Sequence, residues 1–258
     1  MKSRPIHSLP FVATESGRYH LAATMRVDSG EFALKIEAEG VTVDLAGHTI
    51  ESQCEVAVLV NAPCLSLFNG VLQSSHVALA TEPRQQAHNS RFSQLEVTGD
   101  IHLPSDHLVF ESCRVRAQSY GIHAGRSALI SGCRIQGAIL GVEVGPGSTV
   151  VASEISECED GLYALGAREQ SCTIERVTVK NCRGLGLCLD GPGRVLRCQV
   201  HGNGTELHSG GILAGPASIV EECRAWDNLG GDIRTVDPTE LRNNETSDGT
   251  GQELSNAE

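Results

Sequence analysis

Four residues with side chains suited to proton transfer recur at nearly constant spacing in the middle of the sequence: His102, His123, Glu143 and Tyr163. A His with a pKa near neutrality can take a proton, and a Tyr hydroxyl can return one. A carboxylate can orient the imidazole or act as a second acid. This combination is typical of lyases, epimerases and isomerases, which move protons next to a carbonyl or carboxylate without a cofactor. We therefore predict these four residues as catalytic.

Two arginines follow the segments that contain His123 and Tyr163, and they are candidates for binding a substrate. β-Elimination in polysaccharide lyases needs a group that neutralises the substrate carboxylate, and Arg126 and Arg168 are available for this role. Cys188 lies at the corresponding place in a later segment and is a third candidate. His208 is a fourth, because it lies in a longer loop, and loops on a rigid scaffold often bind ligands.

The segments that hold these residues repeat at a fixed period. Gly121, Gly141 and Gly161 are 20 residues apart, and each opens a short alternating apolar segment that is followed by two further short strands. Coils of this length have no room for a crossover helix, so parallel pairing must occur between successive coils. The sequence predicts an all-β chain, a single-stranded right-handed parallel β-helix (solenoid) of about nine or ten three-strand coils.

In a strand packed on one side, alternate residues face water, so the middle residue of each first strand should point outward. Neighbouring coils lie about 4.8 Å apart, which places His123 and Tyr163 roughly 10 Å apart with Glu143 between them. A slip of the register in residues 54–110 would remove His102 from this row. The predicted outward column is Leu59, Ala78, His102, His123, Glu143, Tyr163, Cys188, Leu213.

Six of the ten cysteines fall into two columns of the same register, and no pair of cysteines has the CxxC spacing of a zinc or redox site. Stacked reduced cysteines behave as small hydrophobes that fill a narrow interior, and stacked asparagines can form side-chain ladders at a turn. One column reads Cys113, Cys133, Ser153, Val177, Cys198, Cys223, and a second reads Gln118, Ala138, Cys158, Cys182, Asn203, Asn228.

Two N-terminal segments resemble a known superfamily. Residues 41–50 (VTVDLAGHTI) are similar to the opening coil of the right-handed parallel β-helix repeat superfamily, the pectate-lyase-like group, and residues 9–21 (LPFVATESGRYHL) to its lead-in. The resemblance implies a fold and not a reaction. The calcium-binding Asp set of pectate lyases, the Gly-His-Gly of polygalacturonase-type hydrolases and the Asp-Pro-His-Glu of alginate epimerases are absent from the sequence. We expect an N-terminal cap in 1–30, the β-helix in 31–235 and an acidic polar tail in 236–258.

The amino-acid composition limits the classes of molecule that the protein can bind. The formal charge of -12 and the absence of a basic stripe exclude nucleic acid as a partner, and they disfavour a polyuronate unless Arg and Lys cluster locally. One Trp and three Tyr favour a compact site over a long glycan groove. We find neither a secretory signal nor an apolar stretch of membrane-spanning length, so we expect a cytoplasmic protein without a membrane partner.

Three alternatives to this enzyme hypothesis remain open. The outward column can be an ordinary polar surface, with the protein a non-catalytic glycan- or protein-binding module. The fold can shape a pocket for a small-molecule cyclase of a biosynthetic pathway. Finally, His102, His123 and Glu143 can be read as ligands of one metal ion, although we expect neither metal nor cofactor.

Overall fold

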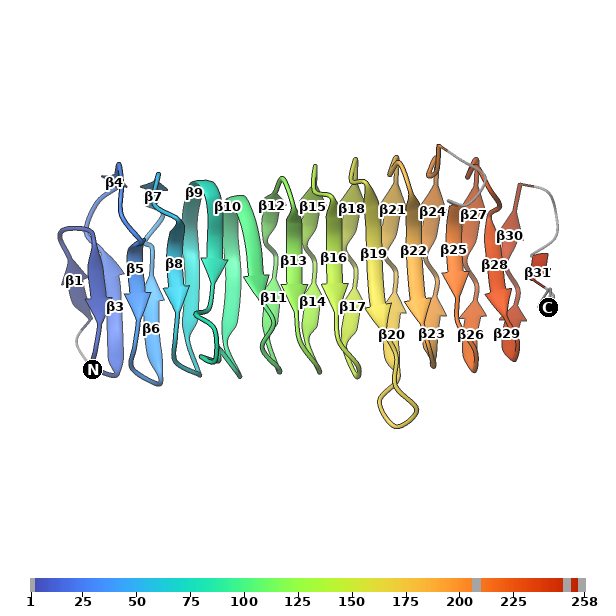
Figure 1. Cartoon of the computed structure of the whole chain (residues 1–258), viewed down its shortest axis with the longest axis horizontal. Helices are drawn as coiled ribbons and strands as arrows, with labels where there is room; N and C mark the ends of the chain where they lie inside the picture. The colour runs from blue at the N-terminus through green and yellow to red at the C-terminus, as the bar shows by residue number, and fades with distance from the viewer. Residues whose placement is uncertain (1–2, 206–209, 248–251, 255–258) are drawn as a thin grey trace.

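The computed structural model describes residues 3–205 and 210–247 in full, and the backbone of 252–254. In these residues the chain is all β, and its strands form one parallel solenoid of about 11 turns (Figure 1). The predicted fold is confirmed, and the number of turns is close to the number of coils predicted. None of the described residues forms a helix of the length and apolarity that a membrane crossing requires.

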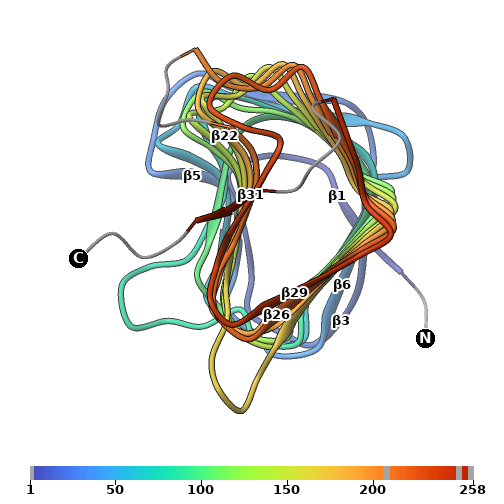
Figure 2. The ribbon, with the colours of Figure 1, turned by 90° about the vertical axis from the view of Figure 1, so that its right-hand side faces the viewer.

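Each coil contributes one strand, or part of a long strand, to each of three parallel sheets, which form the walls of the solenoid (Figure 2). Sheet 1 contains β2 (Phe11–Ala13), β5 (Phe32–Ile36), β8 (Val56–Val60), the ends of β9 (Ser66–Ala80) and β10 (Arg91–Leu103), β13 (Tyr120–Ala124), β16 (Leu140–Val144), β19 (Asp160–Leu165), β22 (Leu185–Asp190), β25 (Gly210–Ala214), β28 (Ile233–Val236) and β31 (Gln252–Leu254).

Sheets 2 and 3 follow sheet 1 in every coil, and β9 and β10 pass through all three. Sheet 2 contains the first parts of β9 and β10 together with β1 (Arg4–Ile6), β3 (Gly17–Leu21), β6 (Val41–Asp44), β11 (Val109–Glu111), β14 (Leu129–Ser131), β17 (Thr149–Val151), β20 (Cys172–Glu175), β23 (Gly193–Leu196), β26 (Ser218–Glu221) and β29 (Thr239–Arg242). Sheet 3 contains the middle parts together with β4 (Met25–Val27), β7 (Thr49–Ser52), β12 (Arg114–Arg116), β15 (Arg134–Gln136), β18 (Glu154–Ser156), β21 (Thr178–Lys180), β24 (Gln199–His201), β27 (Arg224–Trp226) and β30 (Glu245–Thr246).

Strands also occupy much of the two segments that flank 31–235. β1 to β4 lie before residue 31 and pair in parallel with the strands of the neighbouring coils. β29, β30 and β31 lie after residue 236 and continue the three sheets. Parallel pairing between coils therefore continues on both sides of residues 31–235.

The repeated glycines of sheet 1 allow neighbouring coils to approach closely. A Cβ atom on Gly141 would lie 2.5 Å from the carbonyl oxygen of Gly161 and 2.6 Å from Ile155 Cγ2, which is too close for any side chain. Gly121 and Gly161 face the same restriction from the coil that follows each of them. The 20-residue glycine period is thus a packing requirement, since no other residue fits there.

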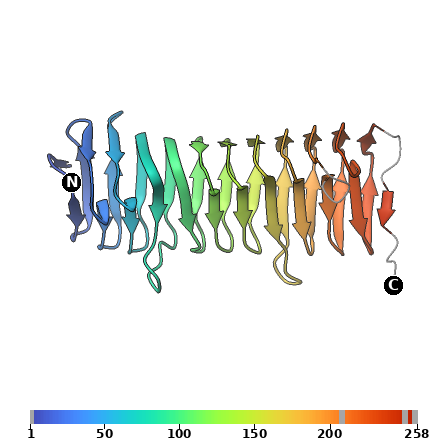
Figure 3. The same cartoon turned by 45° about the horizontal axis from the view of Figure 1, so that its top comes forward.

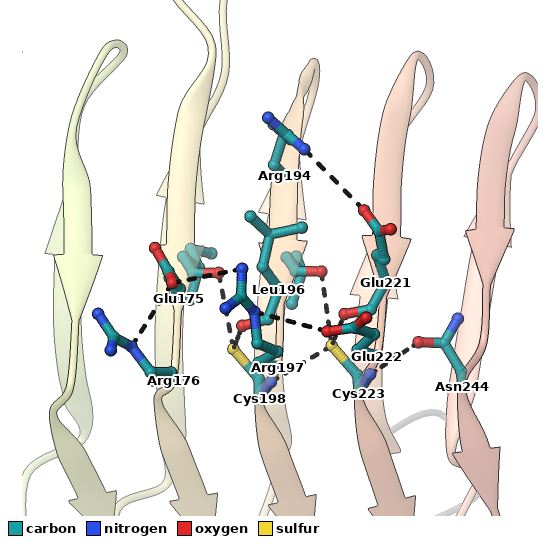
Figure 4. Close-up of polar contacts among 12 residues, drawn as sticks. Glu175, Arg176, Arg194, Leu196, Arg197, Cys198, Glu221, Glu222, Cys223 and Asn244 are labelled. Atoms are coloured by element: carbon teal, nitrogen blue, oxygen red, sulfur yellow. Dashed lines mark hydrogen bonds and ion pairs between the residues drawn. The ribbon is translucent and has the colours of Figure 1, made fainter.

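A single residue in the left-handed region joins sheet 2 to sheet 3 in most coils, and it forms a sharp corner. Its φ is 53° at Arg176, 54° at Arg197 and 54° at Glu222. Figure 4 shows the side chains at this corner, where Arg197 lies 3.7 Å from Glu175 and 3.6 Å from Glu222. Such exposed ion pairs contribute little stability each, typically about 0–1 kcal/mol, so the corner depends mainly on backbone pairing.

All ten cysteines are free thiols and nine of them are buried; eight of these belong to the interior core, and the ninth is the outward Cys188. At the corner in Figure 4, the Cys198 amide donates to Cys223 Sγ at 3.4 Å, and the Cys223 amide donates to Asn244 Oδ1 at 2.9 Å. In the second column the Asn203 amide side chain donates to Asn228 Oδ1 at 2.9 Å. Small apolar thiols and an asparagine ladder therefore occupy the positions that the register gives them.

We expect Gly141→Ala to destabilise the protein by about 1–3 kcal/mol, because the added methyl group overpacks the contact with the next coil. Urea unfolding followed by circular dichroism measures this change. The matched control is Gly132→Asn, where φ is +62° and the nearest atom to an added Cβ, Ser112 Oγ, lies at 3.7 Å. Equal stability of Gly141→Ala and the wild type would contradict the packing argument.

Candidate functional site

The register of sheet 1 brings five of the predicted site residues into one line. In successive strands His102 pairs with His123, His123 with Glu143, Glu143 with Tyr163, and Tyr163 with Cys188. Their neighbours in the strands, such as Ile122 and Ala124, are buried, so the line lies on the outward face of β10, β13, β16, β19 and β22. These side chains, 20 or more residues apart in sequence, are neighbours one coil apart.

One member of the predicted column is wrong. Ala78 is fully buried, and Ala80 takes its place beside Leu59 and His102. The reason is a register irregularity between β9 and β10, where Asp100 pairs with Val77 but Ile101 pairs with Leu79. The observed column also continues to Lys35 at one end and Arg234 at the other: Lys35, Leu59, Ala80, His102, His123, Glu143, Tyr163, Cys188, Leu213, Arg234.

The two histidines form a direct pair. Their Nδ1 atoms lie 3.0 Å apart, so one ring donates and the other accepts, and the accepting imidazole is neutral. The ring of Tyr120 packs against both, with centroids at 5.6 Å from His102 and 5.4 Å from His123. Partial burial lowers the pKa of His123 below its usual 6.5, and the charge of His102 acts in the same direction. At neutral pH His123 is therefore a neutral base.

Glu143 lies beside the two histidines, and its charge opposes the effect of burial on the pKa of His123. One of its carboxylate oxygens is 4.0 Å from His123 Nε2, and both side chains are about a quarter exposed, at 25% and 22%. The charge of Glu143 raises the pKa of His123, although less than burial lowers it. The carboxylate is thus placed to stabilise an imidazolium once His123 has taken a proton.

Tyr163 is held in its protonated form. Its hydroxyl donates to Asp190 Oδ2 at 3.1 Å. Burial, followed by this hydrogen bond and the charge of Asp190, raises the pKa of Tyr163 to about 12. At neutral pH the phenol therefore retains a proton that it can donate.

Cys188 differs from a reactive thiol. The side chain is nearly buried, and burial together with the charges of Asp190 and Asp160 raises its pKa to about 12. The charge of Arg234 opposes this shift without reversing it. Because the thiolate is the nucleophile, Cys188 is suited to shaping the surface and not to covalent catalysis.

The predicted substrate-binding arginines lie at one edge of sheet 1. Arg126 follows β13, and Arg168 lies in the loop between β19 and β20; both side chains are exposed. The loops after β9 and β19, residues 81–90 and 166–171, project from this edge (Figures 2 and 3). His208 lies outside the described residues. The edge beside the column is therefore where cationic side chains can reach a bound molecule.

Tyr120 and Asp190 are part of the site but did not emerge from the sequence, because only the middle residue of each strand was considered. Tyr120 belongs to a second outward column, in register with Leu140 and Asp160. Asp190 pairs in register with Leu165. The same coil-to-coil repeat, applied to the first and last residues of each sheet 1 strand, identifies both residues.

The metal hypothesis for His102, His123 and Glu143 gains no support from the geometry. Across residues 3–205 and 210–247, no three His, Cys, Asp or Glu side chains are arranged to hold a metal ion. The direct contact between the two imidazoles also uses one nitrogen of each ring. The column is better suited to acid–base chemistry than to coordination.

Comparisons with known proteins give the family and the fold. The profile described as "Right handed beta helix region" matches residues 75–215 and 140–254, which together span most of the chain. The A-module of the mannuronan C-5 epimerase AlgE4 from Azotobacter vinelandii is similar in structure, with a TM-score of 0.57 and 12% identity over 94% of this chain and 91% of that one. The periplasmic alginate epimerase AlgG has a TM-score of 0.57 and 10% identity over 91% and 76%. No curated protein matches the sequence. At these identities the similarity concerns the fold alone.

We expect Glu143→Gln to lower the pKa of His123 further, because the carboxylate charge that raises it is removed. Proton NMR titration of the imidazole resonances measures this pKa, with His123→Ala identifying the signal. Glu55→Gln, which removes an exposed carboxylate outside the column, is the control and should leave the titration unchanged. An unchanged or raised pKa in Glu143→Gln would contradict the assigned role of Glu143.

Proposed function

The chain belongs to the right-handed β-helix family, and we propose that it is a carbohydrate epimerase or lyase that acts on a uronate-type sugar at the outward face of sheet 1. One observation carries the proposal: a neutral imidazole at His123 and a protonated phenol at Tyr163 lie two coils apart on one exposed face. Two coils correspond to roughly 10 Å, which leaves room for one sugar ring between base and acid. The epimerase activities named for the two similar structures agree with this class of reaction.

In the first step His123 removes the proton from the carbon that bears the sugar carboxylate. When His123 Nδ1–H donates to His102, the lone pair on Nε2 is free to accept that proton. The C–H bond breaks, and its electron pair delocalises into the carboxylate as an enolate. The imidazolium that forms lies beside Glu143, whose charge stabilises it.

In the second step Tyr163 donates its proton. Donation to the opposite face of the same carbon inverts that centre and gives epimerisation. Donation to the glycosidic oxygen, with cleavage of its bond to the neighbouring carbon and formation of a double bond, gives elimination. In either case the phenolate recovers its proton from water or, through water, from the imidazolium, so proton balance requires no cofactor.

The substrate carboxylate needs a positive neighbour, and the centre of the column cannot supply one because Glu143 occupies it. Arg126 and Arg168, at the edge of sheet 1, are the residues that we assign to this role. The net charge of -12 repels an anionic sugar, but most of this repulsion is screened at the binding site. Charges beyond about 8–10 Å are largely screened at physiological salt, so the nearby arginines dominate.

A non-catalytic binding module is the second candidate. The observation that favours it is the openness of the face, since Arg126, Arg168 and His102 are exposed. In that case the column contacts a glycan without changing it. Solvent isotope exchange separates the two candidates, because only a base that breaks the C–H bond introduces deuterium.

Incubation of mannuronan and, separately, polygalacturonate with the protein in D2O provides the test. Proton NMR reports deuterium incorporation and epimerisation, and ultraviolet absorbance reports the unsaturated product of elimination. We expect activity on at least one polymer, and a loss of about 10²- to 10⁴-fold in His123→Ala. Tyr163→Phe should lose product formation but still exchange deuterium into recovered substrate, because the base remains.

The matched control is His107→Asn, which changes an exposed His in a turn with φ of 56°, a conformation that Asn tolerates. It should retain full activity. Absence of exchange with both polymers, or equal rates in His123→Ala and the wild type, would overturn the catalytic proposal.

A further inference from the structure

Sheet 3 presents a second ordered face, separate from the column on sheet 1. From β12 to β27 its strands are three residues long, and in each of them the middle residue is buried while the first and third lie on the outward side. The parallel register stacks the third residues into one row: Thr98, Arg116, Gln136, Ser156, Lys180, His201, Trp226. This row contains the only Trp of the chain and several polar groups.

Hollows follow sheet 3 along the solenoid. One of about 380 Å³ lies over β12, β15, β18 and β21, with Arg114, Arg116, Arg134 and Lys180 among its lining residues. Another of about 230 Å³ lies nearer the N-terminus over β7 and β9, and a third of about 160 Å³ lies beside Trp226. The face is therefore a discontinuous groove and not a flat surface.

The central hollow is positively charged although the protein is acidic. Four cationic side chains line it against two carboxylates, Glu154 and Glu157. Glu154 is shared, since it lies 2.7 Å from Lys180 and 3.5 Å from Arg134. Arg114 and Arg116 are exposed and form no ion pair with any other residue that the structure describes. They remain available to an anionic ligand.

An aromatic platform lies at the C-terminal end of the same row. His201 and Trp226 stack with ring centroids 4.3 Å apart and an angle of 11° between their planes. Burial, together with the charge of Lys180, lowers the pKa of His201, so this ring is neutral at neutral pH. Trp226 also lines the hollow of about 160 Å³ with Thr246 and Ser247, which leaves space for a sugar ring beside the indole.

We propose that sheet 3 binds a linear acidic oligosaccharide, with its carboxylates on Arg114, Arg116 and Arg134 and one of its rings against Trp226. Arg116 and Trp226 are five coils apart, or about 24 Å, so the groove fits a chain of several sugars and not a single one. The site is independent of catalysis on sheet 1, and its function is to hold a polymer.

The pattern of groups favours a glycan over a single-stranded nucleic acid. Proteins that hold single strands combine a continuous cationic groove with several aromatic side chains for successive bases. Here Glu154 and Glu157 lie among the cations, where they repel regularly spaced phosphates but can accept hydrogen bonds from sugar hydroxyls. Only one indole is present.

Binding of a mannuronate oligosaccharide longer than the groove to the His123→Ala protein tests the proposal without turnover of the ligand. Isothermal titration at low salt measures Kd, and the fluorescence of the single Trp reports contact at Trp226 directly. We expect Arg114→Gln/Arg116→Gln to raise Kd about tenfold or more and to flatten its salt dependence. Trp226→Ala should also weaken binding.

The matched control is Arg18→Gln/Arg194→Gln, which removes the same charge from two exposed arginines of sheet 2, outside the groove. It should leave Kd within about twofold, well below the tenfold change that corresponds to about 1.4 kcal/mol. Circular dichroism of each variant checks that the solenoid remains folded.

The outcomes separate this proposal from the proposed function. Binding to the inactive His123→Ala protein that depends on Arg114 and Arg116 and changes the Trp fluorescence supports it, whatever the activity at sheet 1. Preference for a sulfated over a carboxylated oligosaccharide also supports it and identifies the anion. Equal loss in the control variant, loss only when the sheet 1 column is changed, or equally tight binding of oligothymidylate would overturn it.

Discussion

Backbone hydrogen bonding between successive coils is the interaction on which the rest of this structure depends. It fixes the coil spacing at about 4.8 Å and gives every side chain a partner one coil away. The small residues follow from this spacing: Gly121, Gly141 and Gly161 allow the close approach, and thiols fill the narrow interior. Outside, the same spacing places side chains more than 20 residues apart in sequence in direct contact, as in the pair of His102 and His123.

The chemistry of the sheet 1 column comes from partial burial and not from unusual residues. Each outward side chain is flanked by its neighbours in the coils before and after it, so it loses part of its hydration without leaving the surface. For His123 this loss outweighs the charge of Glu143 and keeps the imidazole neutral, and for Tyr163 it keeps the phenol protonated. The same effect keeps Cys188 a thiol. One physical cause therefore produces a base, an acid and an inert group within four successive coils.

The sequence predicted the fold well because the glycine period and the alternating strands are local signals. It failed at Ala78, because β9 and β10 are long strands that pass through all three sheets and contain an irregularity that no periodic reading detects. Tyr120 and Asp190 were missed because they lie at strand ends. The cationic hollow was missed because the outward column was derived only for the first strand of each coil, whereas Arg114 and Arg134 lie in the third strand. The net charge of -12 also conceals this local cluster of cations.

A solenoid and a linear polymer are both periodic, so one small protein can bind the same polymer at two faces. Short turns connect sheet 3 to sheet 1 in several coils, such as residues 117–119 between β12 and β13 and 181–184 between β21 and β22. A chain held weakly on sheet 3 keeps its neighbouring sugars close to sheet 1, so the second contact becomes intramolecular and its effective concentration rises. Weak local sites are then sufficient. The shallow, open column and the scarcity of aromatic residues, which argue against tight binding at sheet 1 alone, are compatible with a protein that binds its polymer at several places along its length.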